Sequence, residues 1–360
     1  MKYIINIIFF ALIGQMLVAQ QTPAPAQSKP IIIMNATAHL GNGKVIENSA
    51  IAFENGKLSL VADAKTIRLD LSKYEVVKAE GKHVYPGFIA PNTIIGLVEI
   101  EAVRATRDDR EVGEMNPSIR ALIAYNTDSK VTPTIRSNGV MLAQVVPQGG
   151  TIPGQSSVMS LDGWNWEDAQ YKADEGIHLE WPAPFRRTGW WAAPGPIEKS
   201  KTYDKNLREI DEFFKEAQGY INKTAPEKTN LKFEAMKGLF NGQKQLYIHT
   251  NFAKPMMEAV LWAEKYGITP VIIGGKDSWQ ITDFLKEHKV MIILNQPQAL
   301  PVRDYDDIDM PYKTPSILEK AGVTFCLSMN GGWEQRNLVF QGGQAISYGL
   351  DKEAAVKALT

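Results

Sequence analysis

The sequence is short of cysteine and of clustered charge, and both shortages exclude classes of protein. Its 360 residues include a single cysteine, Cys326, so no disulfide can form within the chain. Cys326 lies in the apolar run VTFCLSM, which is typical of a packed core thiol rather than of a nucleophile. The net charge is −1, and no long run of one sign occurs. The composition therefore argues against a nucleic-acid partner and gives no support for electrostatic docking to a membrane.

A long apolar run occurs at the N-terminus, from Ile4 to Ala19, directly after the basic residue Lys2. The run is short for a membrane span, and Ala19 offers the small residue of a cleavage site. We therefore predict a signal peptide over residues 1–19, a flexible lead over residues 20–30, and a mature protein that is periplasmic or secreted without a stable membrane anchor. A membrane anchor helix is the alternative interpretation of the same run.

Residues 31–84 show short apolar runs separated by turn residues, which is typical of β-structure. The glycine- and asparagine-rich pairs at residues 41–43 and 55–56 are hairpin signals. Because so few strands cannot bury a good core alone, we expect a small β-sandwich segment that needs more chain to complete it. The sequence stops at AAVKALT, in what looks like a helix, so we expect the sandwich to be incomplete and the chain to be a C-terminal truncation.

From residue 85 to residue 360 the pattern changes to apolar strands that alternate with amphipathic helices. The strand-like runs are VMLAQVVP, KQLYIHTN, TPVIIGG, VMIILN and VTFCLSMN. Strands that are apolar on both faces and separated by helices indicate a parallel sheet covered by helices. The spacing fits a (β/α)8 barrel of the TIM type or a doubly wound sheet, and in a barrel the chemistry lies where the strands end.

Insertions are predicted between about residues 162 and 241. Five of the eight tryptophans fall in residues 162–196, namely Trp164, Trp166, Trp181, Trp190 and Trp191. This cluster fits either a stacking platform for a sugar or aromatic ligand or a long loop folded on its own aromatic side chains, and we favour the loop. Residues 199–241 carry apolar positions at helical spacing, which predicts an outer-layer helix.

The ordered set of these features resembles the amidohydrolase superfamily, in particular its imidazolonepropionase-like branch. GKHVYPGFIAPNT looks like the first barrel strand of that family, where a Pro-Gly-Phe-Ile segment leads into Asp-x-His-x-His. QKQLYIHTNF is similar to the fifth strand with its ligand histidine, and AGVTFCLSMNGGWEQRN to the eighth strand with its aspartate position. The likeness runs from about residue 31 to the end. It implies a TIM barrel that holds one or two divalent metals and hydrolyses non-peptide C–N bonds.

Most of the metal-ligand positions of that family fall on residues that bind no metal well. The aspartate of the family's first strand falls on Ala90, and its two histidines fall on Asn92 and Ile94. The histidines of the fifth and sixth strands fall on His249 and Gly274, and the aspartate of the eighth strand falls on Asn330. No residue is assigned to the fourth-strand lysine or glutamate. An amide is a weak ligand without general-base capacity, and catalytic zinc takes about three protein ligands. The resemblance therefore implies a degenerate metal site.

Other residues offer little from which that site could be rebuilt. Six carboxylates after the first strand could hold a hard ion such as Ca²⁺, although a solvated surface is the favoured interpretation. They are Glu99, Glu101, Asp108, Asp109, Glu111 and Glu114. GGTIPGQSS lacks the Gly-Lys-Ser/Thr ending of a phosphate loop and indicates a tight turn. The histidines outside the family positions, which show no mutual ligand spacing and are placed away from the strand ends, are His39, His83, His178 and His288.

We therefore predict an exported amidohydrolase-like protein that binds a small-molecule ligand or supports a catalytically competent relative as an accessory subunit. The residues predicted to line the barrel mouth are Asn92, His249, Asn251, Gly274, Asn295 and Asn330, with Trp333 and Arg336 beside them. No cofactor is expected. The alternative is an active hydrolase of C–N bonds with an altered mononuclear or metal-free site, in which a single zinc ion would bind through His249. A purely structural role would predict an occluded mouth.

Overall fold

The computed structural model describes residues 22–360, apart from residue 191 and residues 224–227. The predicted signal peptide lies outside these described residues. Residues 22–30 form no helix or strand, and Gln27 ties them to the first sheet by donating to the backbone oxygen of Phe53 at 2.8 Å. Within the described ranges, no helix is long and apolar enough to cross a membrane.

The N-terminal part folds into one five-stranded sheet. Its strands are β1 (Ile31–His39), β2 (Val45–Glu54), β3 (Lys57–Asp63), β4 (Glu75–Lys78) and β5 (His83–Val84). The order is β3-β2-β1-β4, with β5 also paired to β1. The β2–β3 turn places Asn55 and Gly56 at φ 51° and 73°, the left-handed region that two-residue hairpin loops need. A second sheet packed face to face is not seen among the described residues 31–84, so the sandwich stays a prediction.

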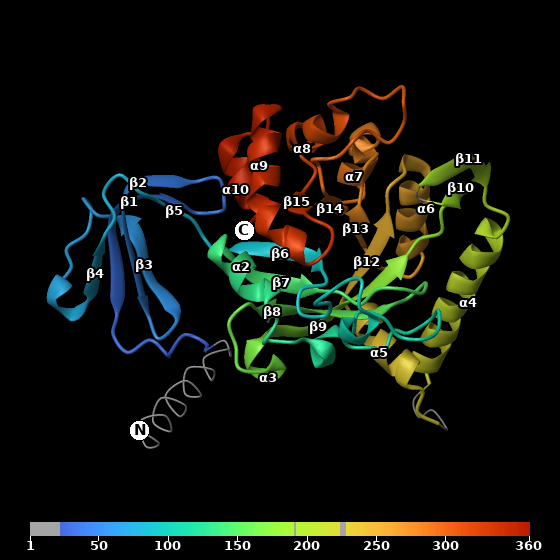
Figure 1. Ribbon diagram of the computed structural model, residues 1–360, viewed down its shortest axis with the longest axis horizontal. Coiled ribbons are helices and arrows are strands. Elements are labelled where there is room, and N and C mark those ends of the chain that lie inside the picture. Colours follow the sequence, from blue (N-terminus) through green and yellow to red (C-terminus); the bar gives the residue numbers. More distant parts are fainter. Residues whose placement is uncertain (1–21, 191, 224–227) are drawn as a thin grey trace, which may run out of the picture.

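The larger part is built on an eight-stranded, nearly closed barrel sheet (Figure 1). Its strands, in both chain and spatial order, are β6 (Phe88–Thr93), β7 (Val140–Val145), β8 (Gly154–Ser160), β9 (Gln170–Glu180), β12 (Gln245–Thr250), β13 (Val271–Gly274), β14 (Met291–Asn295) and β15 (Phe325–Ser328). Successive side chains along a strand point to opposite faces of the sheet, so the apolar residues of these strands pack into two separate clusters. Leu246 and Ile248 join the main core with the helices, whereas Tyr247 packs with Val271 and Ile273 on the other face.

The third barrel strand departs from the predicted all-parallel order, because β8 runs antiparallel to both β7 and β9. Only residues 146–153 connect β7 to β8, whereas a parallel crossover needs roughly a dozen residues or more. The fourth barrel strand, β9, lies inside the stretch 162–241 that the sequence pattern indicated as an insertion. The barrel therefore takes part of its wall from that stretch.

The seam of the barrel lies between the edge strands β6 and β15. Residues 358–359 bridge it, since the amide of Leu327 on β15 donates to the backbone oxygen of Ala358 and the amide of Ile89 on β6 donates to that of Leu359, both at 2.9 Å. Above them, the Thr93 hydroxyl donates to the backbone oxygen of Gly331 at 2.8 Å. The two edges are thus joined by a short stretch of chain and a side chain.

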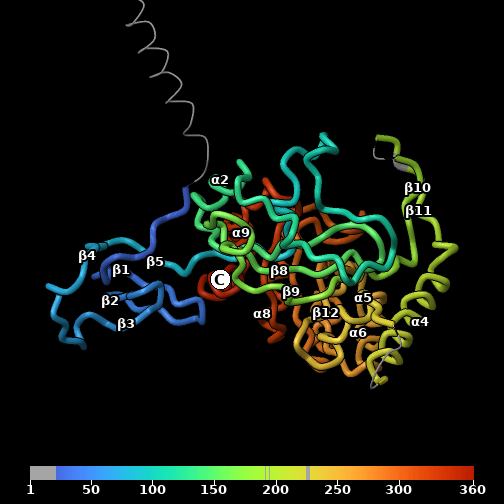
Figure 2. The backbone as a smooth tube through the Cα atoms, turned by 90° about the horizontal axis from the view of Figure 1, so that it is seen from below, coloured from blue at the N-terminus to red at the C-terminus, as the bar shows by residue number. Residues whose placement is uncertain are grey.

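Helices cover the barrel, most regularly beside the parallel strands from β12 onward (Figure 1). They are α2 (Val131–Ser137), α3 (Trp166–Ala169), α4 (Tyr203–Ile221), α5 (Leu231–Phe240), α6 (Ala253–Glu264), α7 (Thr282–Glu287), α8 (Met310–Ala321), α9 (Leu338–Ser347) and α10 (Lys352–Lys357). A hairpin of β10 (Phe185–Trp190) and β11 (Ala193–Lys199) precedes α4. The N-terminal sheet and α4 lie at opposite ends of the molecule in both views (Figure 2).

The tryptophans of residues 162–196 do not form a single platform. Trp164 is exposed, Trp166 begins α3, and Trp181 is buried beyond the end of β9, where its ring packs on Trp262 at 5.3 Å. Trp190 lies at the end of β10, and the predicted partner Trp191 is outside the described residues. The stacking platform and the loop folded on its own aromatic side chains both stay predictions.

Candidate functional site

A cavity of about 330 Å³ lies where the barrel strands end. Six of the predicted mouth residues line it together, namely Asn92, His249, Asn251, Gly274, Asn295 and Asn330. Gln148, Glu180, Trp181 and Phe252 also line it, and these four were not predicted. An adjoining cavity of about 320 Å³ shares Asn92, Gln148 and Asn330 with the first. The first cavity is called the barrel mouth below, and the second is called the adjoining cavity.

Trp333 and Arg336, which were predicted to lie beside the mouth, line neither of these cavities. They belong to a short 3-10 helix, η5 (Trp333–Asn337), which follows the loop after β15. The guanidinium of Arg336 lies over the Trp333 ring at 4.7 Å and donates to the Trp333 backbone oxygen at 2.8 Å. Because these two side chains pack on each other, they are placed as a surface pair rather than as pocket residues.

His249 is held on both sides of its ring. Its Nε2 lies 2.9 Å from Nδ1 of His178, and its Nδ1 lies 3.3 Å from Oε1 of Glu180. A proton on His249 Nδ1 faces the Glu180 carboxylate, and Nε2 then accepts from His178, so this tautomer suits both contacts. No lone pair of the His249 ring is then left free to take a proton from a ligand.

His178 is a site residue that the sequence did not reveal. It lies on β9, fully buried, with its ring stacked on Tyr247 at 4.8 Å. Burial lowers the pKa of His178 well below its ordinary value, and the neighbouring His249 lowers it further. Burial also lowers the pKa of His249, which the Glu180 carboxylate partly offsets. Both imidazoles are therefore neutral at neutral pH.

Beneath the mouth a buried carboxylate organises the barrel interior. Glu175 on β9 accepts from Gln144 Nε2 at 2.7 Å, from the Ser156 hydroxyl at 2.5 Å and from the Tyr247 hydroxyl at 2.8 Å. Burial and the Glu175 charge raise the pKa of Tyr247, which keeps its hydroxyl a donor. The side-chain oxygen of Gln144 in turn accepts from the backbone N–H of Asn92 at 3.0 Å. Asn92 has φ 52°, a left-handed conformation that asparagine tolerates better than most residues.

Gly274 is at a position that rejects any side chain. Its φ is +104°, and a β-carbon there would lie 2.6 Å from Asn251 Oδ1 and 2.8 Å from the backbone oxygen of Thr250. The carboxamide of Asn251 occupies the space into which a residue at 274 would project. A histidine at this position would require the Asn251 side chain and the β12 backbone to move.

The side chains that line the mouth at the ends of β14 and β15 are neutral amides, and they hydrogen-bond to one another. Asn295 Nδ2 donates to Asn330 Oδ1, and Asn330 Nδ2 donates to Gln296 Oε1 at 2.9 Å. The Ser328 hydroxyl donates to Asn295 Oδ1 at 3.3 Å. Asn330 is thus one member of an uncharged hydrogen-bonded chain.

The residues present do not fit the divalent metal that the fold family implies. Over the described residues, no three His, Cys, Asp or Glu side chains are grouped so as to hold a metal ion. Both ring nitrogens of His249 already face a partner. Among the six carboxylates after the first strand, Asp109 is buried and bound by Arg107 and Arg110 at 3.3 and 3.2 Å.

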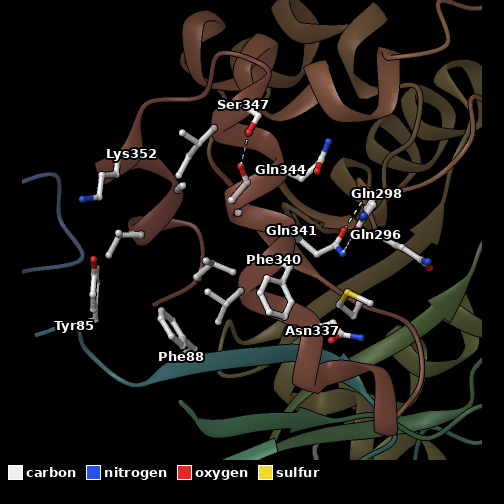
Figure 3. Close-up of a pocket in the computed structure, with 18 residues that line it drawn as sticks. Tyr85, Phe88, Gln296, Gln298, Asn337, Phe340, Gln341, Gln344, Ser347 and Lys352 are labelled. Carbon is white, nitrogen blue, oxygen red and sulfur yellow. Dashed lines mark hydrogen bonds between the residues drawn. The ribbon is translucent and has the colours of Figure 1, made fainter. Parts of the chain in front are cut away.

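A larger cavity of about 970 Å³ lies away from the mouth, along α9 and α10 (Figure 3). Phe88 and the exposed Phe340 line it, together with several carboxamides that include Gln341. The side chains that line it include no histidine, cysteine or carboxylate, and Lys352 is their one charged member. The barrel mouth, in contrast, is lined by an imidazole and a carboxylate, those of His249 and Glu180, and is therefore the candidate site.

No family model matches the sequence, and no curated protein matches it. Among solved structures, the fold is similar to that of an amidohydrolase from Thermotoga maritima, with a TM-score of 0.76 and 21% identity, covering 92% of this chain and 86% of that one. A molinate hydrolase gives 0.53 and 14%, covering 92% and 84%. A prolidase complexed with N-methylphosphonate-L-proline gives 0.51 and 14%, covering 92% and 86%. The described part of the chain therefore has the fold of the amidohydrolases.

Proposed function

We propose that this protein binds a small polar molecule in the barrel mouth and does not hydrolyse it. The observation that carries the proposal is the cavity at the strand ends, which is lined by four asparagine side chains. Asn92, Asn251, Asn295 and Asn330 surround a space in which the fold family would place imidazoles and carboxylates. Carboxamides both donate and accept hydrogen bonds, which suits recognition, but they have no general-base capacity.

The geometry at two positions supports a rebuilt site rather than the loss of single ligands. At Gly274 the Asn251 amide takes the space of a side chain, and at His249 both ring nitrogens are engaged within the protein. A metal-free hydrolase is the competing function, because the half-exposed carboxylate of Glu180 is a base that faces the mouth cavity. The imidazolonepropionase-like branch, the export and the accessory role all stay predictions.

Elemental analysis of the purified protein, after dialysis against trace zinc, manganese and iron, tests this proposal first. We expect no stoichiometric metal, and no difference between the wild type, His249→Ala and His288→Ala. His288 is the matched control, because it pairs with Glu264 on the protein surface. Stoichiometric metal that disappears only in His249→Ala would overturn the proposal in favour of a mononuclear hydrolase.

Turnover of an amide panel by the wild type, abolished in Glu180→Gln, would instead establish the metal-free hydrolase.

A further inference from the structure

The charge in the mouth cavity is of one sign. Of the side chains that line the cavity of about 330 Å³, only Glu180 carries a formal charge at neutral pH. His249 also lines it, but burial lowers the pKa of its imidazole, so it adds no positive charge there. The contact from His249 Nδ1 to Glu180 is therefore made by a neutral donor and brings no positive charge to the carboxylate.

The arginines of the neighbourhood do not neutralise Glu180. Arg107 and Arg110 line the adjoining cavity, where both reach the buried carboxylate of Asp109. Glu101 lines that second cavity as well, so its lining holds two arginines and two carboxylates. A ligand that enters the first cavity thus meets one carboxylate whose charge no cation of the described lining compensates.

The rest of the cavity suits a cation that carries N–H donors. Asn92 Oδ1 and Asn251 Oδ1 are both shielded from solvent and have no hydrogen-bond partner, so either oxygen gains a donor if its amide turns toward a bound amine. Trp181 and Phe252 supply aromatic surface beside Glu180, and the Trp181 ring is fixed against Trp262. Aromatic faces attract ammonium groups, and a carboxylate forms its strongest hydrogen bonds with charged donors.

From these observations we propose that the mouth takes a small organic cation, namely a primary amine whose ammonium group pairs with Glu180. This inference rests on the proposed binding function and names the class of its ligand. A volume of about 330 Å³ lies at the small end of the range of ligand cavities, so the amine is a compact molecule. Carboxylates of the same size are repelled by Glu180.

Isothermal titration calorimetry at pH 7.5 with benzylamine, benzyl alcohol and benzoate tests the inference, because the three probes match in size and differ in charge. We expect benzylamine to bind at least tenfold more tightly than either other probe. In Glu180→Gln its affinity falls at least tenfold, whereas Glu101→Gln changes it less than twofold. Glu101 is the matched control, because it lines only the adjoining cavity.

The outcomes separate the ligand class from the binding function. The proposal of a cationic ligand is overturned if benzyl alcohol or benzoate binds as tightly as benzylamine, or if Glu180→Gln leaves the affinity for benzylamine unchanged. Either result leaves the mouth as a binding site. Absence of binding by all three probes up to millimolar concentration overturns the cation and the binding function together. If Glu180→Gln fails to fold, the ranking of the three probes on the wild type decides alone.

Discussion

The substitution Gly274→Ala tests whether position 274, where the resemblance to the amidohydrolases predicts a ligand histidine, can hold a side chain. Two costs add at this position. A non-glycine residue at φ +104° costs about 1–2 kcal/mol in backbone strain. The added β-carbon would lie 2.6 Å from Asn251 Oδ1 and 2.8 Å from the Thr250 oxygen, and relief of such overpacking costs about 1–3 kcal/mol. We expect the free energy of unfolding to fall by about 2–5 kcal/mol in total.

Gly267→Ala separates the two costs, because Gly267 also has a positive φ, +72°, but a β-carbon there meets nothing within 4 Å. Urea unfolding of both variants at pH 7.5, followed by circular dichroism, gives the comparison. We expect Gly267→Ala to lose only the strain of about 1–2 kcal/mol. The difference between the two variants is then the steric cost of the Asn251 amide and the β12 backbone.

Asn251→Gly in the Gly274→Ala background removes one of the two blocking atoms and leaves the other. Part of the lost stability should return, which a double-mutant cycle measures as a coupling between the two positions. If Gly274→Ala costs no more than Gly267→Ala, then Asn251 yields freely. The position could then accept a histidine, and the reasoning for a rebuilt site would be refuted.

Three further predictions follow from the buried polar groups. In the unfolded chain the imidazole of His178 takes up a proton as the pH falls through about 6.5. In the folded protein burial lowers the pKa of the same imidazole, so it stays neutral. The free energy of unfolding should therefore drop by about 2 kcal/mol between pH 7 and pH 5. Urea unfolding of His178→Phe should show a smaller drop, and identical pH profiles would contradict the assignment. Glu175→Ala removes the acceptor of three hydrogen bonds and should lower the free energy of unfolding by about 3–5 kcal/mol in the same assay. Glu175→Gln should lower it clearly less. A loss below about 1 kcal/mol in Glu175→Ala would contradict the network. Burial raises the pKa of the Cys326 thiol to about 12, although the residue is only partly buried. Ellman's reagent should therefore react with it much more slowly in the folded protein than after unfolding, and equal rates would contradict the raised pKa.

The sequence predicted the second half of the barrel well, for a physical reason. The strands from β12 to β15 are covered by helices on one face and face the barrel interior on the other, so they stand out as apolar runs. The amphipathic helices between them carry the complementary pattern. The same runs end at or near Asn251, Gly274, Asn295 and Asn330. Because the chemistry of a barrel lies where its strands end, these residues could be predicted to line one cavity, as they do.

The missed part of the site lies on β9, where the pattern is polar. Its sequence, QYKADEGIHLE, points Glu175, His178 and Glu180 toward the interior network and the mouth, so it lacks the apolar run of a buried strand. A buried carboxylate and a buried imidazole are stabilised by partners far along the chain, which local pattern does not show. The short connection over residues 146–153 was the available signal that β8 turns back on β7 and that a further strand must follow.

The bridge of residues 358–359 across the barrel seam has a consequence for how the molecule folds. The hydrogen bond from Ile89 to Leu359 joins the first barrel strand to the last residues of the described chain, so it closes a loop that spans the whole barrel. Closing such a long loop costs conformational entropy before the contacts at its ends form. Chains dominated by contacts between residues far apart in sequence therefore fold slowly. The barrel wall can therefore assemble strand by strand while the seam stays open. Until residues 358–359 arrive, the amides of Ile89 and Leu327 remain exposed at two sheet edges, where another chain could pair with them.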